Sequence, residues 1–160
     1  MANKSNIVQK IVYIAHPIAG DLERNLERIR VIVKMVNHIY TDIVPFVPYY
    51  ADVVSLDDND PGDRARGIAN SREIFLRGVI DEVWLFGDEV SPGMRAETEL
   101  AKELGIPVFS TVGDERPAVE FFHERGSGIP KRMISMRINE IFRGGVLTDD
   151  EIMSIINDEQ

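Results

Sequence analysis

Short apolar runs alternate with helical stripes along the first 110 positions of this chain of 160 residues. The runs at 10–15, 43–47, 81–87 and 106–109 are rich in β-formers and predict strands, the third of them buried on both faces. Between the runs, apolar residues three or four apart predict amphipathic helices. These helices cover residues 21–40, residues 63–79 and the stretch between Ser91 and Gly105.

Local signals set the ends and inner faces of these helices. Asp21 and Ser91 stand where N-caps belong, Pro92 suits the first helical position, and Gly105 closes the third helix. The inward positions of the second helix are predicted to be Ile68, Phe75 and Val79. Those of the third are Ala96, Leu100, Ala101 and Leu104.

The order of elements predicts the fold class. Alternating strands and helices favour a three-layer α/β/α fold with a parallel, Rossmann-like or flavodoxin-like sheet of four to five strands. One domain is expected, with its core over about 8–110 and a helical extension over about 111–160. The extension is expected to hold helices at 117–123, 130–142 and 149–157. Residues 48–63 read as a long polar loop, a feature that is often functional.

The composition of the chain argues against several classes of binding partner. A formal net charge of −9 argues against binding a nucleic acid polymer, which requires clustered Lys and Arg. There is no cysteine, and His16, His38 and His123 lack metal-ligand spacing, so no metal and no cofactor are predicted. No apolar run is long enough for a signal peptide or a membrane span, and we expect a cytoplasmic protein without a membrane partner.

The third strand and the helix after it carry the strongest candidate chemistry. The start of a helix after a parallel strand faces the crevice at the sheet edge and favours anions. Ser91 and the amides of Gly93 and Met94 are expected there, with the carboxylate of Glu97 one turn further in. A carboxylate near a helix start also serves as ordinary dipole compensation or as part of a cap, so both readings of Glu97 stay open.

Other residues are expected at the same edge, each with a structural alternative. Tyr13 is either a site residue or a core aromatic. His16 is either a loop residue that makes a backbone hydrogen bond or, with Pro17 and Gly20, a contact for a base or phosphate. Tyr49 and Tyr50 can stack on a base or simply cover the sheet edge.

These motifs, in this order, resemble the nucleoside 2-deoxyribosyltransferase superfamily. The similarity includes its branch of 2'-deoxynucleoside 5'-monophosphate N-glycosidases and related small phage proteins, and it covers roughly residues 10–110. Its elements are a Tyr on the first strand in VYIAHPIAG, an Asp before a later strand in DEVWLFG, the Gly-x-x-x-Glu of GMRAE and the Gly-x-Pro-Val of GIPV.

The resemblance implies that Glu97 is the nucleophile and that Tyr13 orients it. A second acid would protonate the leaving base, and Asp81 or Glu73 are the candidates. The transferases carry an Asp where this chain has Ser91, whereas the monophosphate glycosidases have Ser. A hydroxyl at a helix start can donate to a phosphate that a carboxylate would repel. The first loop, HPIAGD, departs from the Arg-Gly-Gly type of the glycosidases.

The expected reaction is N-glycosidic cleavage or deoxyribosyl transfer on a (2'-deoxy)nucleoside 5'-monophosphate. The sequence does not choose between water and a second base as acceptor. The alternatives are a non-catalytic nucleotide-binding protein that sequesters or senses its ligand, and a structural module that binds no ligand. The resemblance also implies a homodimer or higher homo-oligomer that takes a small nucleotide or nucleoside.

Overall fold

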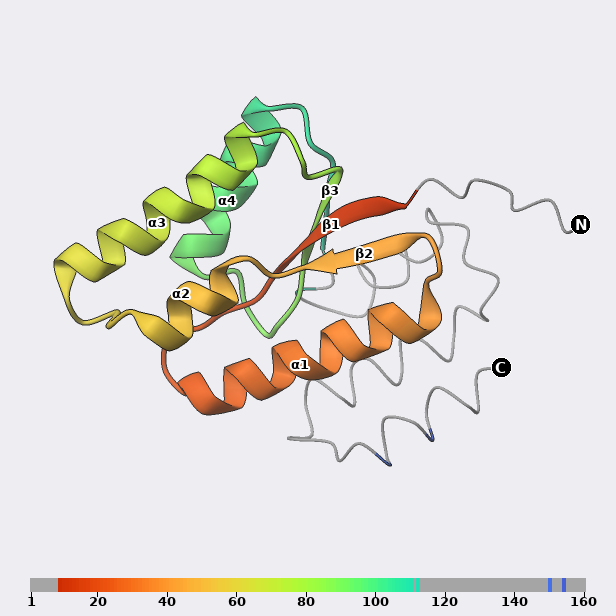
Figure 1. Cartoon of the computed structure of the whole chain (residues 1–160), viewed down its shortest axis with the longest axis horizontal. Helices are drawn as coiled ribbons and strands as arrows, with labels where there is room; N and C mark the ends of the chain where they lie inside the picture. Colours follow the sequence, from red (N-terminus) through yellow and green to blue (C-terminus); the bar gives the residue numbers. More distant parts are fainter. Residues whose placement is uncertain (1–8, 111, 113–149, 151–153, 155–160) are drawn as a thin grey trace, which may run out of the picture.

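The computed structural model describes residues 9–110, 112, 150 and 154, and these contain a four-stranded parallel sheet (Figure 1). The strands are β1 (Lys10–Ala15), β2 (Ile43–Phe46), β3 (Glu82–Leu85) and β4 (Val108–Ser110), in the order β2-β1-β3-β4. The predicted three-layer α/β fold with a parallel sheet is confirmed.

Four helices accompany the sheet within this part of the chain. They are α1 (Leu22–Ile39), α2 (Tyr49–Ser55), α3 (Pro61–Leu76) and α4 (Pro92–Glu103). Figure 1 shows α1 on one side of the sheet and α3 with α4 on the other. The chain therefore leaves β1 toward one face and β3 toward the opposite face. Such a switch point opens a crevice between the carboxyl ends of the two strands, where α/β proteins bind ligands.

The core lies between the sheet and the helices on its two faces. Tyr13 and Val83, which are register partners on β1 and β3, belong to one buried cluster with Phe75 of α3 and Ala101 of α4. Trp84, the next residue along β3, is also fully buried and contacts Tyr40 at the end of α1. Since strand side chains alternate between faces, β1 and β3 are buried on both sides, which confirms the prediction for the third strand.

Two carboxylates, those of Glu82 and Asp81, accept hydrogen bonds at the amino edge of the sheet. Glu82 is buried and accepts hydrogen bonds from Lys10 Nζ at 2.7 Å and from the indole N–H of Trp84 at 2.8 Å. Asp81 accepts a hydrogen bond from the backbone amide of Ile11 at 2.8 Å. Because buried charge is costly unless paired, the Glu82 pairing stabilises this edge.

The predicted caps are confirmed at α1 and α4. Asp21 accepts from the amide of Arg24, Ser91 accepts from the amide of Met94, and Pro92 takes the first position of α4. Gly105 ends the helical region with a positive φ of 72°. These ends depend on a few neighbouring residues, which explains why local sequence predicts them.

The second predicted helix is shifted. α3 begins at Pro61 with Asp60 as its N-cap and ends at Leu76, because Gly78 at φ 68° breaks it before position 79. Of its three predicted inward residues only Phe75 is buried, while Ile68 and Val79 are 62% and 44% exposed. The early part of α3 extends beyond the sheet in Figure 1, so this end of the helix does not pack on the sheet.

The inner face of α4 also differs from the prediction. Ala101 is buried and Leu100 partly buried, but Ala96 is exposed and Leu104 is 42% exposed. Met94 is buried in their place. The inner face instead runs through Met94, Glu97 and Ala101, so a charged residue occupies a position that an apolar stripe cannot reveal.

The prediction of a loop over residues 48–63 is wrong, because the seven residues Tyr49–Ser55 form α2 and α3 begins at Pro61. Tyrosine and β-branched valine are weak helix formers, so the sequence Tyr49–Ser55 gives little helical signal. Tertiary contacts decide the conformation: Tyr49 is buried and its hydroxyl donates to the carbonyl of Ile14 at 2.8 Å.

The helices predicted at 117–123 and 130–142 lie outside the described residues. So does the helix at 149–157, apart from Asp150 and Ser154, which are both helical. In the described ranges, no helix combines the length and apolar character that crossing a bilayer requires.

Candidate active site

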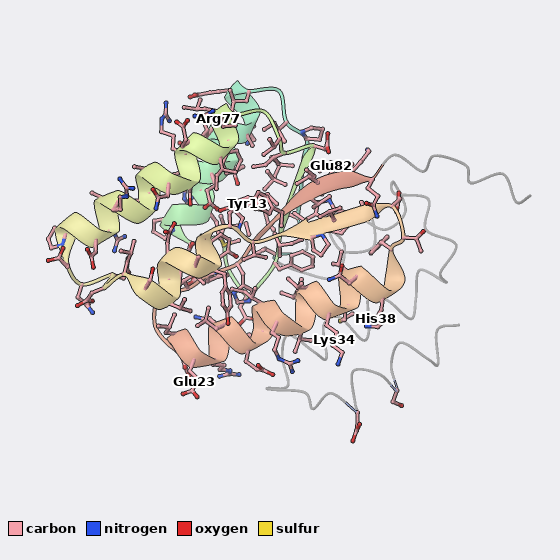
Figure 2. All side chains as sticks on the ribbon, viewed as in Figure 1. Tyr13, Glu23, Lys34, His38, Arg77 and Glu82 are labelled. Atoms are coloured by element: carbon pink, nitrogen blue, oxygen red, sulfur yellow. The ribbon has the colours of Figure 1, made fainter. Side chains whose placement is uncertain are left out.

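The centre of the candidate site is a hydrogen bond between β1 and α4. The hydroxyl of Tyr13 donates to Glu97 Oε1 at 2.6 Å, across 84 positions of sequence. Glu97 lies three residues after Met94 and four before Ala101, so it shares their inward face. Tyr13 lies between the sheet and these helices (Figure 2), and its side chain is fully buried.

Aromatic rings enclose the pair. The ring of Tyr13 lies 4.9 Å from that of Phe75 and 5.7 Å from that of Tyr49, centroid to centroid. Tyr49 therefore belongs to the core beside Tyr13, with its hydroxyl engaged by a backbone carbonyl. Glu97 is itself only partly exposed and its carboxyl loses much of its hydration, which strengthens any electrostatic interaction there.

Burial changes the acidity of both partners. Loss of hydration raises the pKa of Glu97 to about 7, and the hydrogen bond from Tyr13 opposes that rise. Burial, and secondarily the nearby Glu97, raise the pKa of Tyr13 well above 10, so the phenol keeps its proton and acts as a donor. Near neutral pH the Glu97 carboxyl can therefore exchange between an acid and a nucleophilic carboxylate.

The start of α4 offers a polar group near this carboxylate. Ser91 Oγ accepts from the amide of Met94 at 3.3 Å, which leaves the hydroxyl proton of Ser91 available to a ligand. The Met94 amide thus already donates to Ser91, and the Met94 side chain is buried. Met94 is therefore poorly placed as an anion ligand. Gly93 is exposed and is the second residue of α4. Its amide N–H donates to no group in the described part of the chain.

The two predicted second acids are not beside Glu97. Asp81 precedes β3 and bonds Ile11 at the amino edge, whereas a crevice after parallel strands lies at the carboxyl edge. Glu73 forms an ion pair with Arg77 at 2.7 Å on the outer side of α3, and its side chain is 58% exposed. The structure therefore does not bring either residue to the Tyr13–Glu97 pair.

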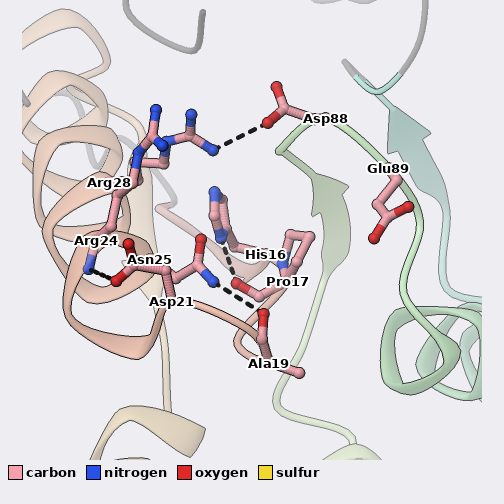
Figure 3. A pocket seen from close by; sticks show the side chains of 9 residues that line it. All are labelled: His16, Pro17, Ala19, Asp21, Arg24, Asn25, Arg28, Asp88 and Glu89. Atoms are coloured by element: carbon pink, nitrogen blue, oxygen red, sulfur yellow. Dashed lines mark hydrogen bonds and ion pairs between the residues drawn. The ribbon is translucent and has the colours of Figure 1, made fainter. Parts of the chain in front are cut away.

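The loop after β1 lies on the α1 side of the crevice (Figure 3). His16 is buried there and hydrogen-bonds the carbonyl of Pro17. A Cβ on Gly87, after β3, would come within 2.6 Å of Pro17 Cδ, so the two loops meet closely. Gly20 adopts a positive φ of 99° in an exposed turn. Tyr50 is 43% exposed and does not join the enclosed site.

Two polar residues of the site were not predicted from the sequence: Ser71, which lies beside Tyr13, and Arg95, which lies at the start of α4. The side chain of Ser71 in α3 hydrogen-bonds the Tyr13 hydroxyl, and this bond lowers the pKa of Tyr13 against the effect of burial. Arg95 lies one helical turn after Ser91 and donates to the carbonyl of Val90 at 3.5 Å, at the exposed start of α4. The spacing of Arg95 from the cap was a readable signal, whereas the contact of Ser71 depends on how α3 crosses β1.

Metal chemistry has no evident ligand set in the described ranges. Among those residues no group of three or more His, Asp or Glu side chains is arranged to hold an ion.

Comparison with known proteins adds one finding. The sequence model of a family described as a domain of unknown function (DUF7768) matches residues 10–111, which include Tyr13, Ser91 and Glu97. No curated protein and no solved structure matches the chain.

Proposed function

The chain belongs to the DUF7768 family of unknown function, and from the chemistry of its own site we propose that it cleaves the N-glycosidic bond of a (2'-deoxy)nucleoside 5'-monophosphate. The observation that carries the proposal is the 2.6 Å hydrogen bond between Glu97 and Tyr13, whose own ring lies against those of Tyr49 and Phe75. A lone helix-capping carboxylate would need neither burial nor a buried phenol as donor.

The proposed reaction uses Glu97 as a nucleophile. A carboxylate oxygen forms a bond to C1' of the sugar while the bond from C1' to the base nitrogen breaks and its electron pair leaves with the base. The departing base takes up a proton from solvent. Water then attacks C1' and breaks the bond to Glu97, which releases the sugar phosphate and restores the carboxylate. A second base in place of water gives deoxyribosyl transfer. Positive charge that develops on the sugar ring is stabilised by the adjacent carboxylate.

Tyr13 keeps Glu97 oriented during this cycle. Because its pKa is high, the phenol remains a donor to Glu97 throughout the neutral range. Its hydrogen bond favours the carboxylate over the acid, which counters the effect of burial. Tyr13 therefore acts as a positioning residue for the nucleophile.

Ser91 supports a phosphate-bearing substrate. Its hydroxyl stands at the start of a twelve-residue helix, together with the amide of Gly93. The guanidinium of Arg95 is on the same first turn. Hydrogen-bond donors, the helix dipole and a cation at one place favour an anion such as a 5'-phosphate.

The direct test is incubation with 2'-deoxynucleosides and their 5'-monophosphates, followed by chromatography for free base. We expect base release from at least one monophosphate and much less from the matching nucleoside. Binding without release would favour the alternative of a nucleotide-sequestering or sensing protein. Neither release nor binding would reject both functions.

The pH profile provides a second prediction. Since Glu97 must be ionised to attack and its pKa is about 7, kcat/KM is expected to rise with pH up to about 7 and then level off. Tyr13→Phe removes the bond that favours ionisation, so its profile is expected to shift to higher pH, with kcat lowered about 10–100-fold. A profile that does not move in Tyr13→Phe would contradict the positioning role.

Ser91→Asp tests recognition of the phosphate. Asp caps helices as well as Ser does, so α4 is expected to stay intact. Its carboxylate would repel a 5'-phosphate, and kcat/KM for the monophosphate is expected to fall about 100-fold while that for the nucleoside changes little. Equal losses for the two substrates would argue against a phosphate at Ser91. Circular dichroism and urea unfolding check that the cap is retained.

A further inference from the structure

A separate cavity opens at the carboxyl edge on the α1 side of the sheet (Figure 3). It has a volume of about 600 Å³, which lies within the range of small-molecule sites. Its walls come from the loop after β1, the first turns of α1 and the loop after β3. Neither Glu97 nor Ser91 lines it.

His16 places in this cavity a hydrogen-bond acceptor that lacks a donor among the described residues. Its Nδ1 lies 2.7 Å from the carbonyl of Pro17, and since a carbonyl only accepts, Nδ1 must carry the hydrogen. The other nitrogen, Nε2, is then an acceptor in the neutral ring. Nε2 is buried, His16 is only 4% exposed, and no described residue donates to Nε2.

The surroundings keep the ring neutral. Burial is the main cause that lowers the pKa of His16 below its usual range, and the positive charge of Arg28 acts in the same direction. Asp88 and the Pro17 carbonyl act in the opposite direction. In Figure 3 the free nitrogen lies on the side of Arg28 and Asp88, away from the Pro17 carbonyl. A buried acceptor of this kind is costly unless a donor reaches it.

The charges around the cavity do not suit a phosphate. Its lining contains two guanidinium groups, Arg24 and Arg28, against three carboxylates, Asp21, Asp88 and Glu89, a formal charge of −1. Arg28 is paired with Asp88 at 3.1 Å, and Asp21 already caps the start of α1. An anion would meet carboxylates and an acceptor, whereas an amino group would meet partners for its N–H bonds.

We propose that this cavity is a second ligand site, distinct from the Glu97 site, for a small molecule whose amino group donates a hydrogen bond to Nε2 of His16. The carboxylates of Asp88 and Glu89 accept the remaining N–H bonds or balance a positive charge. Two kinds of molecule carry this chemistry: an amino-bearing heterocyclic base and an alkyl amine. The inference does not depend on the glycosidic activity, because it concerns binding without turnover.

The test is NMR titration of the full-length protein labelled with ¹⁵N-histidine, with adenine, putrescine and orthophosphate as separate probes. We expect adenine or putrescine to shift the Nε2 resonance of His16 saturably, and orthophosphate to leave it unchanged. A response to adenine alone identifies a heterocyclic base, and a response to putrescine alone identifies an alkyl amine. A shift with orthophosphate, or with none of the three probes, overturns the proposal, the latter because it leaves water as the only partner.

Variants test the residues involved. His16→Phe keeps a ring but removes the acceptor and is expected to weaken binding of the responding probe at least tenfold. Glu89→Gln alters only an exposed side chain and is expected to weaken it about threefold or more, which keeps the test valid if His16→Phe does not fold. His38→Gln, in the last turn of α1, is the control and should bind as wild type does. Unchanged affinity in both cavity variants would contradict the site.

Discussion

Glu97→Gln is expected to lower base release by about 10³-fold or more while leaving nucleotide binding within a few-fold of wild type. Gln has nearly the same shape and can still accept the hydrogen bond from Tyr13, but its amide cannot attack C1'. The measurement combines single-turnover base release with equilibrium binding of the responding monophosphate.

The control is Glu99→Gln, two positions along the same helix. Glu99 is exposed, so its replacement removes the same charge without touching the enclosed pair. It should retain nearly full activity. Comparable losses in both variants would mean that overall charge, rather than the nucleophile, limits the reaction.

The same Glu97→Gln variant is also expected to be more stable than wild type at pH 8. The pKa of Glu97 is about 7 in the folded chain and near 4.5 in the unfolded chain. Its contribution to stability is full below about pH 4.5 and is lost progressively as the pH rises to about 7. Above that pH, Gln avoids a buried charge and is expected to gain on the order of 1–3 kcal/mol in the free energy of unfolding. Urea denaturation at pH 5 and pH 8 should show the advantage growing with pH.

Phe75→Ala is expected to lower the free energy of unfolding by about 3–5 kcal/mol, because it removes a large, fully buried ring from the core. The lost ring lies 4.9 Å from that of Tyr13, so the variant should also loosen the orientation of Glu97. Urea unfolding gives the first effect, and a lowered kcat at a temperature where the variant stays folded gives the second.

The matched control on the same helix is Ile68→Ala. Ile68 is 62% exposed, so its truncation is expected to change the free energy of unfolding by less than about 0.5 kcal/mol. A large effect at Ile68 would mean that another surface covers this part of α3. Equal effects at Phe75 and Ile68 would contradict the packing described for α3.

Sequence reasoning succeeded where a signal is local. The strand at 10–15 and the caps at Asp21 and Ser91 agree with the structure because each depends on residues within one or two turns. It failed at α2, where weak helix formers become helical through the buried Tyr49, and at the end of α3, where Gly78 was passed over. At α2 tertiary contacts decided the conformation, whereas at α3 a local signal, Gly78, ended the helix before the apolar pattern did.

The candidate site was likewise predicted only in part from the sequence. The order of the motifs along the chain, a tyrosine strand, a serine cap and an acidic helix, is a property of the sequence alone. The sequence also nominated Asp81 and Glu73, yet one lies at the amino edge of the sheet and the other faces outward in an ion pair. The place of Asp81 follows from chain order, because a residue just before a parallel strand lies at the amino edge of the sheet, whereas the outward direction of Glu73 depends on how α3 packs.

The sequence by itself determined the alternating α/β architecture, the capped start of α4 and the presence of a carboxylate a turn beyond it. Only the tertiary structure decided that this carboxylate is buried against Tyr13, that its pKa is about 7, and that His16 keeps an unpartnered nitrogen within the described chain. The physical reason is that periodicity fixes the face on which a side chain lies within its own element. The partner that this face meets, and the water it loses, depend on how elements far apart in sequence pack together.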